Sequence, residues 1–287
     1  MKKAKVIAEI GCNHKGDMDI AKEMIKMAKI FCNADVVKFQ KRNNHYWASI
    51  KPKQYNAPHP NPDNAYGETY LAHREALELT KEQNLELMNY CSEIGIEYST
   101  SVWDLDSAKE ITELNPIMIK IPSACNNDFK MLEFLTKNYR GEIHISVGMT
   151  TEKEIEDLMQ FFENEGRIKD VVLYSCTSGY PVPFEDVCLL EILKLKEKYG
   201  SKVKEIGFSG HHLGIAVDIA AYTLGAVVIE RHYTLDRTWK GTDHAASLEP
   251  DGLRKLVRNL RAVEKALQYK SQEILPIEKV QRDKLKR

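Results

Sequence analysis

Polar side chains that can bind anions, metals or protons stand at the ends of short apolar segments of this chain. Lys38 lies within the second segment and Lys120 within the fourth, with apolar neighbours on both sides. The other polar groups at segment ends are Glu9, Gln40, Thr100, Ser123, Ser146, Ser209, His211, Glu230 and His232. A lysine in an apolar segment is unfavourable unless it meets an anion. We therefore expect the two lysines and the hydroxyls to bind a phosphate and a carboxylate.

His211 and His232 end the seventh and eighth apolar segments. In a closed barrel these segments are neighbours, and two imidazoles on neighbouring strands can share a divalent metal ion. Glu9 on the first segment and Asp243 in the loop beyond the eighth favour this interpretation over two hydrogen-bonded core histidines. Two nitrogen ligands with open positions suit an octahedral ion, Mn²⁺ or alternatively Mg²⁺, better than a closed structural zinc site.

Apolar runs of strand length alternate along the whole chain with amphipathic stretches of helical length. The strand candidates are 5–10, 35–40, 96–100, 117–121, 142–147, 171–175, 204–208 and 227–230. The helix candidates are 17–32, 81–94, 104–114, 128–138, 151–165, 185–199, 213–224 and 250–268, and Thr80 and Thr151 begin capping patterns before two of them. This alternation predicts an α/β fold, a (β/α)₈ TIM barrel, with an open doubly wound sheet as the alternative. Both folds bring strand-end side chains to one rim.

Two segments interrupt the alternation. Residues 41–79 contain four prolines and are too long for a plain loop, so we expect a lid or a substrate wall. Residues 269–287 are polar, and we expect them to form a C-terminal tail outside a catalytic barrel domain spanning 1–268.

The composition excludes several classes of protein. The 287 residues carry 41 basic and 42 acidic side chains, so no overall basic field would attract nucleic acid or anionic lipid. Hydrophobic residues make up 43% of the chain, which excludes general disorder, and we find no membrane span or signal peptide. The six cysteines are scattered without a CxxC pair, which favours a reducing cytoplasm.

Several motifs resemble the sialic acid synthase (N-acetylneuraminate synthase) family, which condenses phosphoenolpyruvate with an N-acylated hexosamine. The resemblance runs from about residue 5 to residue 268 and rests on segments 8–16, 37–41, 125–127, 146–149, 176–181, 207–211, 230–236 and 239–244. The last two are closest to the branch that includes animal sialic acid 9-phosphate synthases. The barrel that the alternation predicts is also the fold that this resemblance implies.

The resemblance implies a role for each candidate residue. Lys38, Thr100, Lys120, Ser123, Ser146 and Ser209 match positions that bind phosphoenolpyruvate, and His211 and His232 match metal ligands. Glu9 matches a carboxylate that moves protons, Gln40, Tyr180 and Asp243 match the sugar side or groups that order metal-bound water, and Asn127 belongs to a substrate-binding motif. The implied reaction joins phosphoenolpyruvate to an aldose, an N-acetylmannosamine-like sugar or its 6-phosphate. It yields a nine-carbon 2-keto-3-deoxy acid and phosphate, in a metal-dependent homodimer.

Two departures from the family pattern concern the sugar side. Family members generally continue into a small antifreeze-like domain, which this sequence does not include, and segment 123–127 lacks the usual acidic residue. Two alternatives therefore stay open. One is an aldolase, either metal-dependent or using Lys38 or Lys120 as a Schiff-base nucleophile. The other is a catalytically silent paralogue that binds phosphoenolpyruvate.

Overall fold

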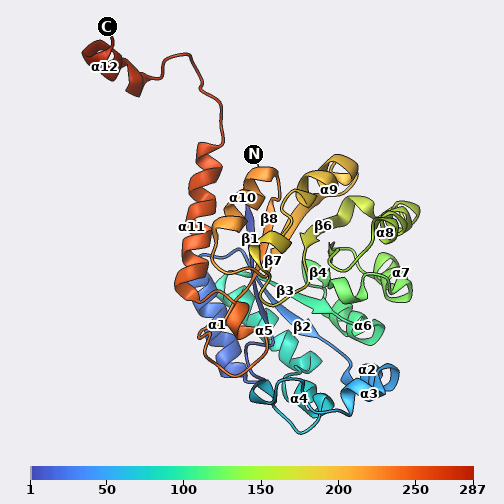
Figure 1. Ribbon diagram of the computed structural model, residues 1–287. Coiled ribbons are helices and arrows are strands. Elements are labelled where there is room, and N and C mark those ends of the chain that lie inside the picture. Colours follow the sequence, from blue (N-terminus) through green and yellow to red (C-terminus); the bar gives the residue numbers. More distant parts are fainter. Residues whose placement is uncertain (1) are drawn as a thin grey trace.

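Eight parallel strands close into a barrel in sequence order, and helices surround it (Figure 1). The computed structural model describes residues 2–287. The strands are β1 (Lys5–Gly11), β2 (Val36–Lys41), β3 (Glu97–Val102), β4 (Met118–Ile121), β5 (Glu142–Ser146), β6 (Val171–Cys176), β7 (Glu205–Gly210) and β8 (Val228–His232). The closed ring confirms the predicted TIM barrel and excludes the open sheet.

The helices follow the predicted alternation, with additional ones in the long insertion. They are α1 (Met18–Ile30), α2 (Asn44–Ile50), α3 (Pro52–Tyr55), α4 (Tyr70–Ala76), α5 (Lys81–Ile94), α6 (Leu105–Leu114), α7 (Phe129–Asn138), α8 (Glu152–Asn164), α9 (Glu191–Tyr199), α10 (Ala216–Leu224), α11 (Pro250–Ala266) and α12 (Pro276–Leu285). Thr80 and Thr151 form the capping boxes that the sequence predicts at the starts of α5 and α8. The helix predicted from residue 185 begins only at Glu191, because the short 3₁₀ turn Phe184–Asp186 precedes it.

The strand register places the polar strand ends in one layer of the barrel. Glu9 pairs laterally with Lys38 on β2 and with His232 on β8. Alternation then directs the residues two positions earlier, such as Ile7 and Val36, to the same inner face. These two belong to a small apolar cluster that is separate from the main core between the strands and the helices. The polar layer therefore lies on a filled apolar base.

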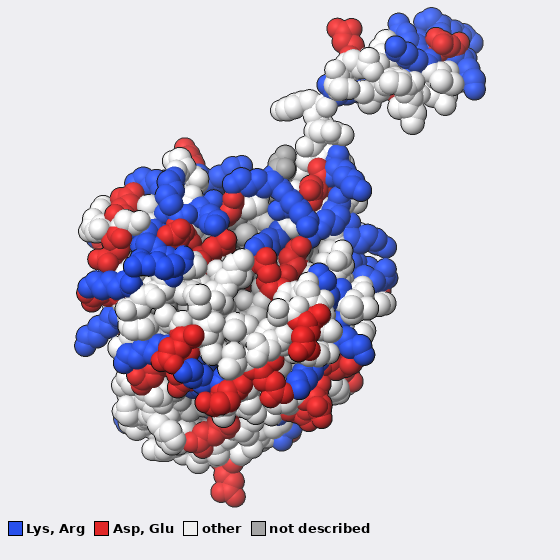
Figure 2. All heavy atoms as spheres, turned by 180° about the vertical axis from the view of Figure 1, so that it is seen from behind, with Lys and Arg blue, Asp and Glu red and all other residues white. Residues whose placement is uncertain are grey.

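The C-terminal helix α12 stands away from the barrel, joined to α11 by residues 267–275 (Figure 1). Acidic and basic side chains are mixed over the face of the barrel seen in Figure 2, and basic side chains gather on the projecting helix. Within residues 2–287, no helix combines the length and apolar character that a membrane crossing requires.

Candidate active site

A cavity of about 310 Å³ opens among the carboxyl ends of the strands. Most of the residues predicted from the sequence line it: Glu9, Lys38, Gln40, Lys120, Ser123, Ser146, Tyr180, Ser209, His211 and His232. Each of the strands other than β3 contributes at least one of these residues, either from the strand itself or from the loop that follows it. The closed barrel thus gathers side chains that are far apart in the sequence into one polar cavity.

The first charged group at the base of this cavity is centred on Lys38. Its Nζ lies 2.7 Å from Oε2 of Glu9 and 3.6 Å from Oε1 of Glu230. It also donates a 2.7 Å hydrogen bond to the hydroxyl of Ser101. Glu9 in turn accepts a 3.0 Å hydrogen bond from Nε2 of Gln40. A buried ammonium is thus held between two carboxylates.

The second charged group pairs Lys120 with Glu230. The Lys120 Nζ lies 3.4 Å and 3.3 Å from the two carboxylate oxygens of Glu230. It also stands 3.3 Å from the ring centre of Tyr174, a contact that favours a cation. The hydroxyl of Ser209 donates to Oε1 of Glu230 over 3.1 Å. Glu230 therefore joins both lysines and the β7 hydroxyl in one network.

Burial and the neighbouring charges together shift the pKa values of these four groups. Burial lowers the pKa of Lys120 to about 8, although Glu230 opposes the change. Burial would also lower the pKa of Lys38, but Glu230 and Glu9 outweigh it and the pKa is raised. Burial raises the pKa of Glu9 in spite of Lys38. For Glu230 the two lysines overcome burial and hold the pKa well below its usual range.

His211 and His232 lie side by side at the cavity wall, with ring centres 5.5 Å apart. Nδ1 of His211 lies 2.9 Å from the carbonyl oxygen of Thr177, which leaves Nε2 free for another partner. Burial lowers the pKa of His211 to about 3, so the ring is a neutral potential ligand near pH 7. Nδ1 of His232 is buried without a hydrogen-bond partner and lies 3.8 Å from Oδ2 of Asp243.

This donor set fits a hydrated divalent ion. Two imidazole ligands would leave most coordination positions to water or substrate, as Mn²⁺ and Mg²⁺ commonly require. Among residues 2–287, no cluster of three or more His, Cys, Asp or Glu side chains is arranged around a metal position. A closed structural zinc site of four protein ligands is therefore a poor fit to the described residues.

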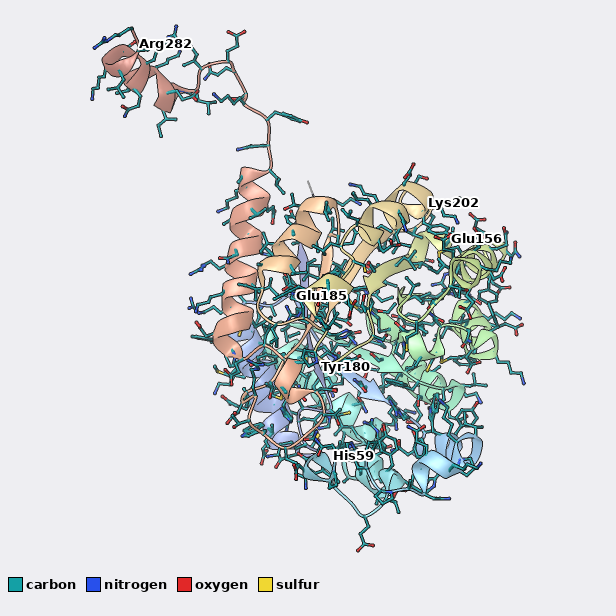
Figure 3. All side chains as sticks on the ribbon, in the orientation of Figure 1. His59, Glu156, Tyr180, Glu185, Lys202 and Arg282 are labelled. Atoms are coloured by element: carbon teal, nitrogen blue, oxygen red, sulfur yellow. The ribbon has the colours of Figure 1, made fainter. Side chains whose placement is uncertain are left out.

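A second hollow of about 200 Å³ continues from the cavity toward the long insertion. Gln40, Trp103, Tyr180 and His232 line both spaces, and Asp243 lines only the second. The Tyr180 ring packs against His211 with ring centres 4.3 Å apart. In Figure 3, Tyr180 lies over the middle of the barrel, and His59 lies within the insertion. The two spaces therefore lie next to each other and share part of their lining.

Two of the predicted binding residues lie outside both spaces. Thr100 is fully buried outside the cavity, because its lateral partners Phe39 and Ile119 both face the main core. Its neighbour Ser101 lines the cavity in its place. Asn127 is exposed and lines neither space. The adjacent Asn126 is buried, donating to the Ser146 carbonyl over 3.0 Å, so it supports the cavity wall.

Two residues that line the cavity, Ser101 and Glu230, are not among the site residues that the sequence predicts. Glu230 was visible as a polar strand end, two residues before His232, which places both on the same face of a strand. That spacing was the available signal for a role in the cavity. Ser101 gave no such signal, because three consecutive hydroxyl residues, 99–101, conceal the alternation.

Comparison with known proteins decides the family. The model of the NeuB family matches residues 24–272. The chain belongs to this family. It is 40% identical over 282 residues to human N-acetylneuraminate-9-phosphate synthase, covering 98% of this chain and 76% of that protein. It is 35% identical to the N,N'-diacetyllegionaminic acid synthase of Campylobacter jejuni, covering 93% of this chain and 78% of that protein.

A solved relative has the same architecture. The structure of N-acetylneuraminic acid synthetase from Leptospira borgpetersenii, in complex with citrate, superposes with a TM-score of 0.81. It is 28% identical and is covered to 93%, while all of this chain is matched. These findings confirm the sialic acid synthase resemblance. This NeuB family member is therefore similar to N-acetylneuraminate-9-phosphate synthase and N,N'-diacetyllegionaminic acid synthase over nearly its whole length.

Proposed function

We propose that this NeuB family member condenses phosphoenolpyruvate with an N-acylated aldose, N-acetylmannosamine-like or its 6-phosphate. The products are a nine-carbon 2-keto-3-deoxy acid and inorganic phosphate. One observation carries the proposal: two buried lysines, Lys38 and Lys120, lie beside carboxylates and hydroxyls at the base of a polar cavity. Phosphoenolpyruvate has both a phosphate and a carboxylate for such a pair to bind.

The lysines and serines form the phosphoenolpyruvate side of the cavity. Lys38 and Lys120 neutralise the phosphate and the carboxylate. The hydroxyl of Ser101, beside Lys38, and that of Ser209, beside Glu230, can donate further hydrogen bonds. Binding of these anions fixes the orientation of the enol carbon toward the second hollow, where the aldose is placed. Ser123 and Ser146 complete the wall on the opposite side of the barrel from β1.

Carbon–carbon bond formation joins C3 of phosphoenolpyruvate to the aldehyde carbon of the open-chain sugar. Electron-deficient character then develops at C2, where water adds, and the C2–O bond to phosphate breaks. Glu9, with its raised pKa, lines the first cavity and is hydrogen-bonded to Gln40, which lines both spaces. It can hold a proton for the aldehyde oxygen or accept one from that water. Gln40, hydrogen-bonded to Glu9, orients this carboxyl group.

His211 and His232 would hold the metal ion, with Asp243 placed beside His232 to order its water ligands. A divalent ion bound here supplies Lewis acidity toward the aldehyde oxygen. The ring of Tyr180 covers both imidazoles, with its centre 4.3 Å from that of His211 and 5.7 Å from that of His232. Tyr180 thus limits the access of bulk water to this edge of the cavity.

A second candidate function is supported by one specific observation. The lowered pKa of Lys120, about 8, is a property of lysines that form Schiff bases. An aldolase acting on a 2-keto-3-deoxy sugar acid would use it as a nucleophile. Borohydride in the presence of pyruvate would then add a reduced adduct to Lys120, detectable by mass spectrometry. The condensing enzyme gives no such adduct.

The deciding experiment measures phosphate release from phosphoenolpyruvate with Mn²⁺ or Mg²⁺ and with EDTA. The acceptors are N-acetylmannosamine, its 6-phosphate, mannose, diacetamido sugars and shorter aldoses. Release that needs both a sugar and a metal supports the proposal. Bound phosphoenolpyruvate without release from any sugar supports the silent paralogue instead.

A homodimer in the cytoplasm is part of the proposal. Six free cysteines, Cys12, Cys32, Cys91, Cys125, Cys176 and Cys188, are compatible with a reducing compartment. Apolar side chains near the mouth of the cavity, among them Met149, Phe184 and Leu190, are more than 60% exposed and offer a surface for a second copy. Light scattering coupled to gel filtration measures the mass in solution and tests the dimer.

A further inference from the structure

Two buried arginines face the second hollow without forming an ion pair. Arg42 and Arg74 are only 8% and 7% exposed and both line this hollow. The Nε atom of each is buried without a hydrogen-bond partner. Within residues 2–287, no carboxylate oxygen lies within 4.0 Å of either guanidinium group. Burying an unpaired charge is strongly unfavourable, so this arrangement indicates that an anion binds here.

The acidic groups nearby are engaged with other partners. The Glu78 carboxylate lies 3.2 Å from Nζ of Lys41 and accepts a hydrogen bond from the backbone amide of Arg42. Asp243, which also lines the hollow, faces His232 at 3.8 Å. The Cys12 thiol, 3.4 Å from Arg74, is neutral because burial raises its pKa. None of these groups lies within ion-pair distance of either arginine; Glu78 acts on Arg74 only as a more distant charge.

The guanidinium groups are held in place by contacts that leave some of their donors free. Cζ of Arg42 stacks 3.7 Å from the ring centre of Trp103, and one of its nitrogens donates to the hydroxyl of Tyr55 over 3.3 Å. Arg74 is fixed through its contact with Cys12. Such rigid, planar donors are well suited to the oxygens of a phosphate group.

We propose that Arg42 and Arg74 form an anion subsite for a phosphate monoester at the far end of the acceptor, so that the acceptor is an aldose phosphate. The inference rests on the proposed function, because that function places the sugar in this hollow. Of the two acceptors proposed above, it selects the phosphorylated one.

Contacts of the protein connect this subsite to the reacting centre. Arg74 touches Cys12 at 3.4 Å, Cys12 lies 3.8 Å from Oε1 of Gln40, and Gln40 donates to Glu9 over 3.0 Å. The anion subsite is therefore separated from the proton-transferring carboxylate by two intervening side chains. An aldose chain laid along this path has its aldehyde at Glu9 and its phosphate at Arg74.

Two loops close the outer side of the hollow. The hydroxyl of Tyr66, in the insertion, donates to the carbonyl of Lys240 over 2.5 Å. The amide of Gly241 donates to the side chain of Asn64 over 3.3 Å. Lys240 also lines the hollow and adds a third positive charge to it. The insertion thus forms the substrate wall, and a phosphate inside this wall is shielded from solvent.

Calorimetric titration tests the subsite independently of turnover. N-acetylmannosamine and its 6-phosphate are titrated into the full chain with phosphoenolpyruvate present and metal absent, so that the Lys38 and Lys120 side is filled. We expect the phosphorylated sugar to bind about ten- to a hundredfold more tightly, as charge-assisted hydrogen bonds provide. Arg74→Gln should remove most of this preference. Arg140→Gln, at an exposed arginine just before β5, should keep it.

Two further variants, Arg74→Lys and Arg42→Gln, test whether a loss of preference comes from misfolding rather than from loss of the anion subsite. Each variant is accepted only with an unchanged circular dichroism spectrum, and Arg74→Lys should retain part of the preference. Equal binding of the two sugars by the wild type overturns the subsite, as does an undiminished preference in both glutamine variants. Measurement of turnover distinguishes a failure of the anion subsite from a failure of the proposed condensation reaction. Phosphate release with equal kcat/KM for both sugars contradicts the subsite alone, whereas a calorimetric preference without any release contradicts the condensation alone.

Discussion

Lys120 and Glu230 meet across the axis of the barrel, with Nζ of the lysine 3.3 Å from Oε2 of the glutamate. They belong to β4 and β8, which lie opposite each other in the ring of eight strands, so no pairing between neighbouring strands brings them together. The same carboxylate lies 3.6 Å from Lys38. Glu230 is therefore the shared counter-ion of both lysines, and in the proposed reaction they would exchange it for phosphoenolpyruvate.

We expect Glu230→Gln to move the alkaline limit of phosphoenolpyruvate use to lower pH. A lysine binds an anion in its protonated form, which is present below its pKa and lost as pH rises through it. The pKa of Lys120, about 8, is set by burial and partly restored by Glu230, so it falls further once that charge is removed. The pH profile of kcat/KM for phosphoenolpyruvate reports the free enzyme and measures this shift. An unchanged alkaline limit would show that Lys120 does not bind the substrate.

Removal of the Lys120 ammonium should abolish turnover. Lys120→Ala deletes a buried charge that binds an anion, a loss of roughly 3–5 kcal/mol, or about two to four orders of magnitude in kcat/KM for phosphoenolpyruvate. The matched control is Lys204→Ala, since Lys204 is about 43% exposed and pairs with Glu142 at the start of β5, away from the cavity. Steady-state kinetics measure kcat/KM for phosphoenolpyruvate in both variants. Normal activity in Lys120→Ala would remove this lysine from the mechanism.

The sequence predicted the barrel and its rim because the signals there are strong. Lys38 and Lys120 each interrupt an apolar strand, so alternation places both on the inner face. In β3 the run Ser99, Thr100, Ser101 offers a hydroxyl on either face, so alternation does not distinguish Thr100 from Ser101. The lateral partners of Thr100 decide its direction, and they are known only from the register of the strands.

Contacts across the barrel and between loops could not be predicted from the sequence, for a different reason. Spacing along one strand indicates a face, but the meeting of Lys120 with Glu230 depends on the diameter of the closed ring and on side-chain length. The same holds for Arg42 and Arg74, which come from the long insertion and converge on one hollow. The sequence predicts that the insertion forms a lid or a substrate wall, but it does not show where the charges of the insertion lie.

Loss of one imidazole should remove the dependence on metal. We expect His211→Ala to bind Mn²⁺ at least about tenfold more weakly, because one of two proposed protein ligands is lost. The control is His45→Ala, since the His45 side chain is 81% exposed, in the insertion. Calorimetric titration of Mn²⁺ into each variant measures the affinity, and phosphate release with and without EDTA measures the dependence. Wild-type affinity in His211→Ala would exclude this residue as a ligand.

The loop that carries His211 depends on a buried ion pair on the outer face of β8. Arg231 lies 2.5 Å from Oδ2 of Asp218 and donates to the carbonyls of His212 and Gly214, over 2.6 Å and 2.8 Å. Asp218→Asn leaves this guanidinium buried without its counter-ion. We expect the free energy of unfolding to fall by about 3–5 kcal/mol, measured by urea denaturation.

The matched control for this pair is Asp251→Asn at the surface. Asp251 is also within ion-pair distance of an arginine, Arg254, at 2.7 Å, but its side chain is 55% exposed. Water already solvates that pair, so the same substitution should lower the free energy of unfolding by less than about 1 kcal/mol. The difference between the two variants isolates the effect of burial. Equal losses would mean that the Arg231–Asp218 pair does not hold the β7–α10 loop, and the position of His211 would need another explanation.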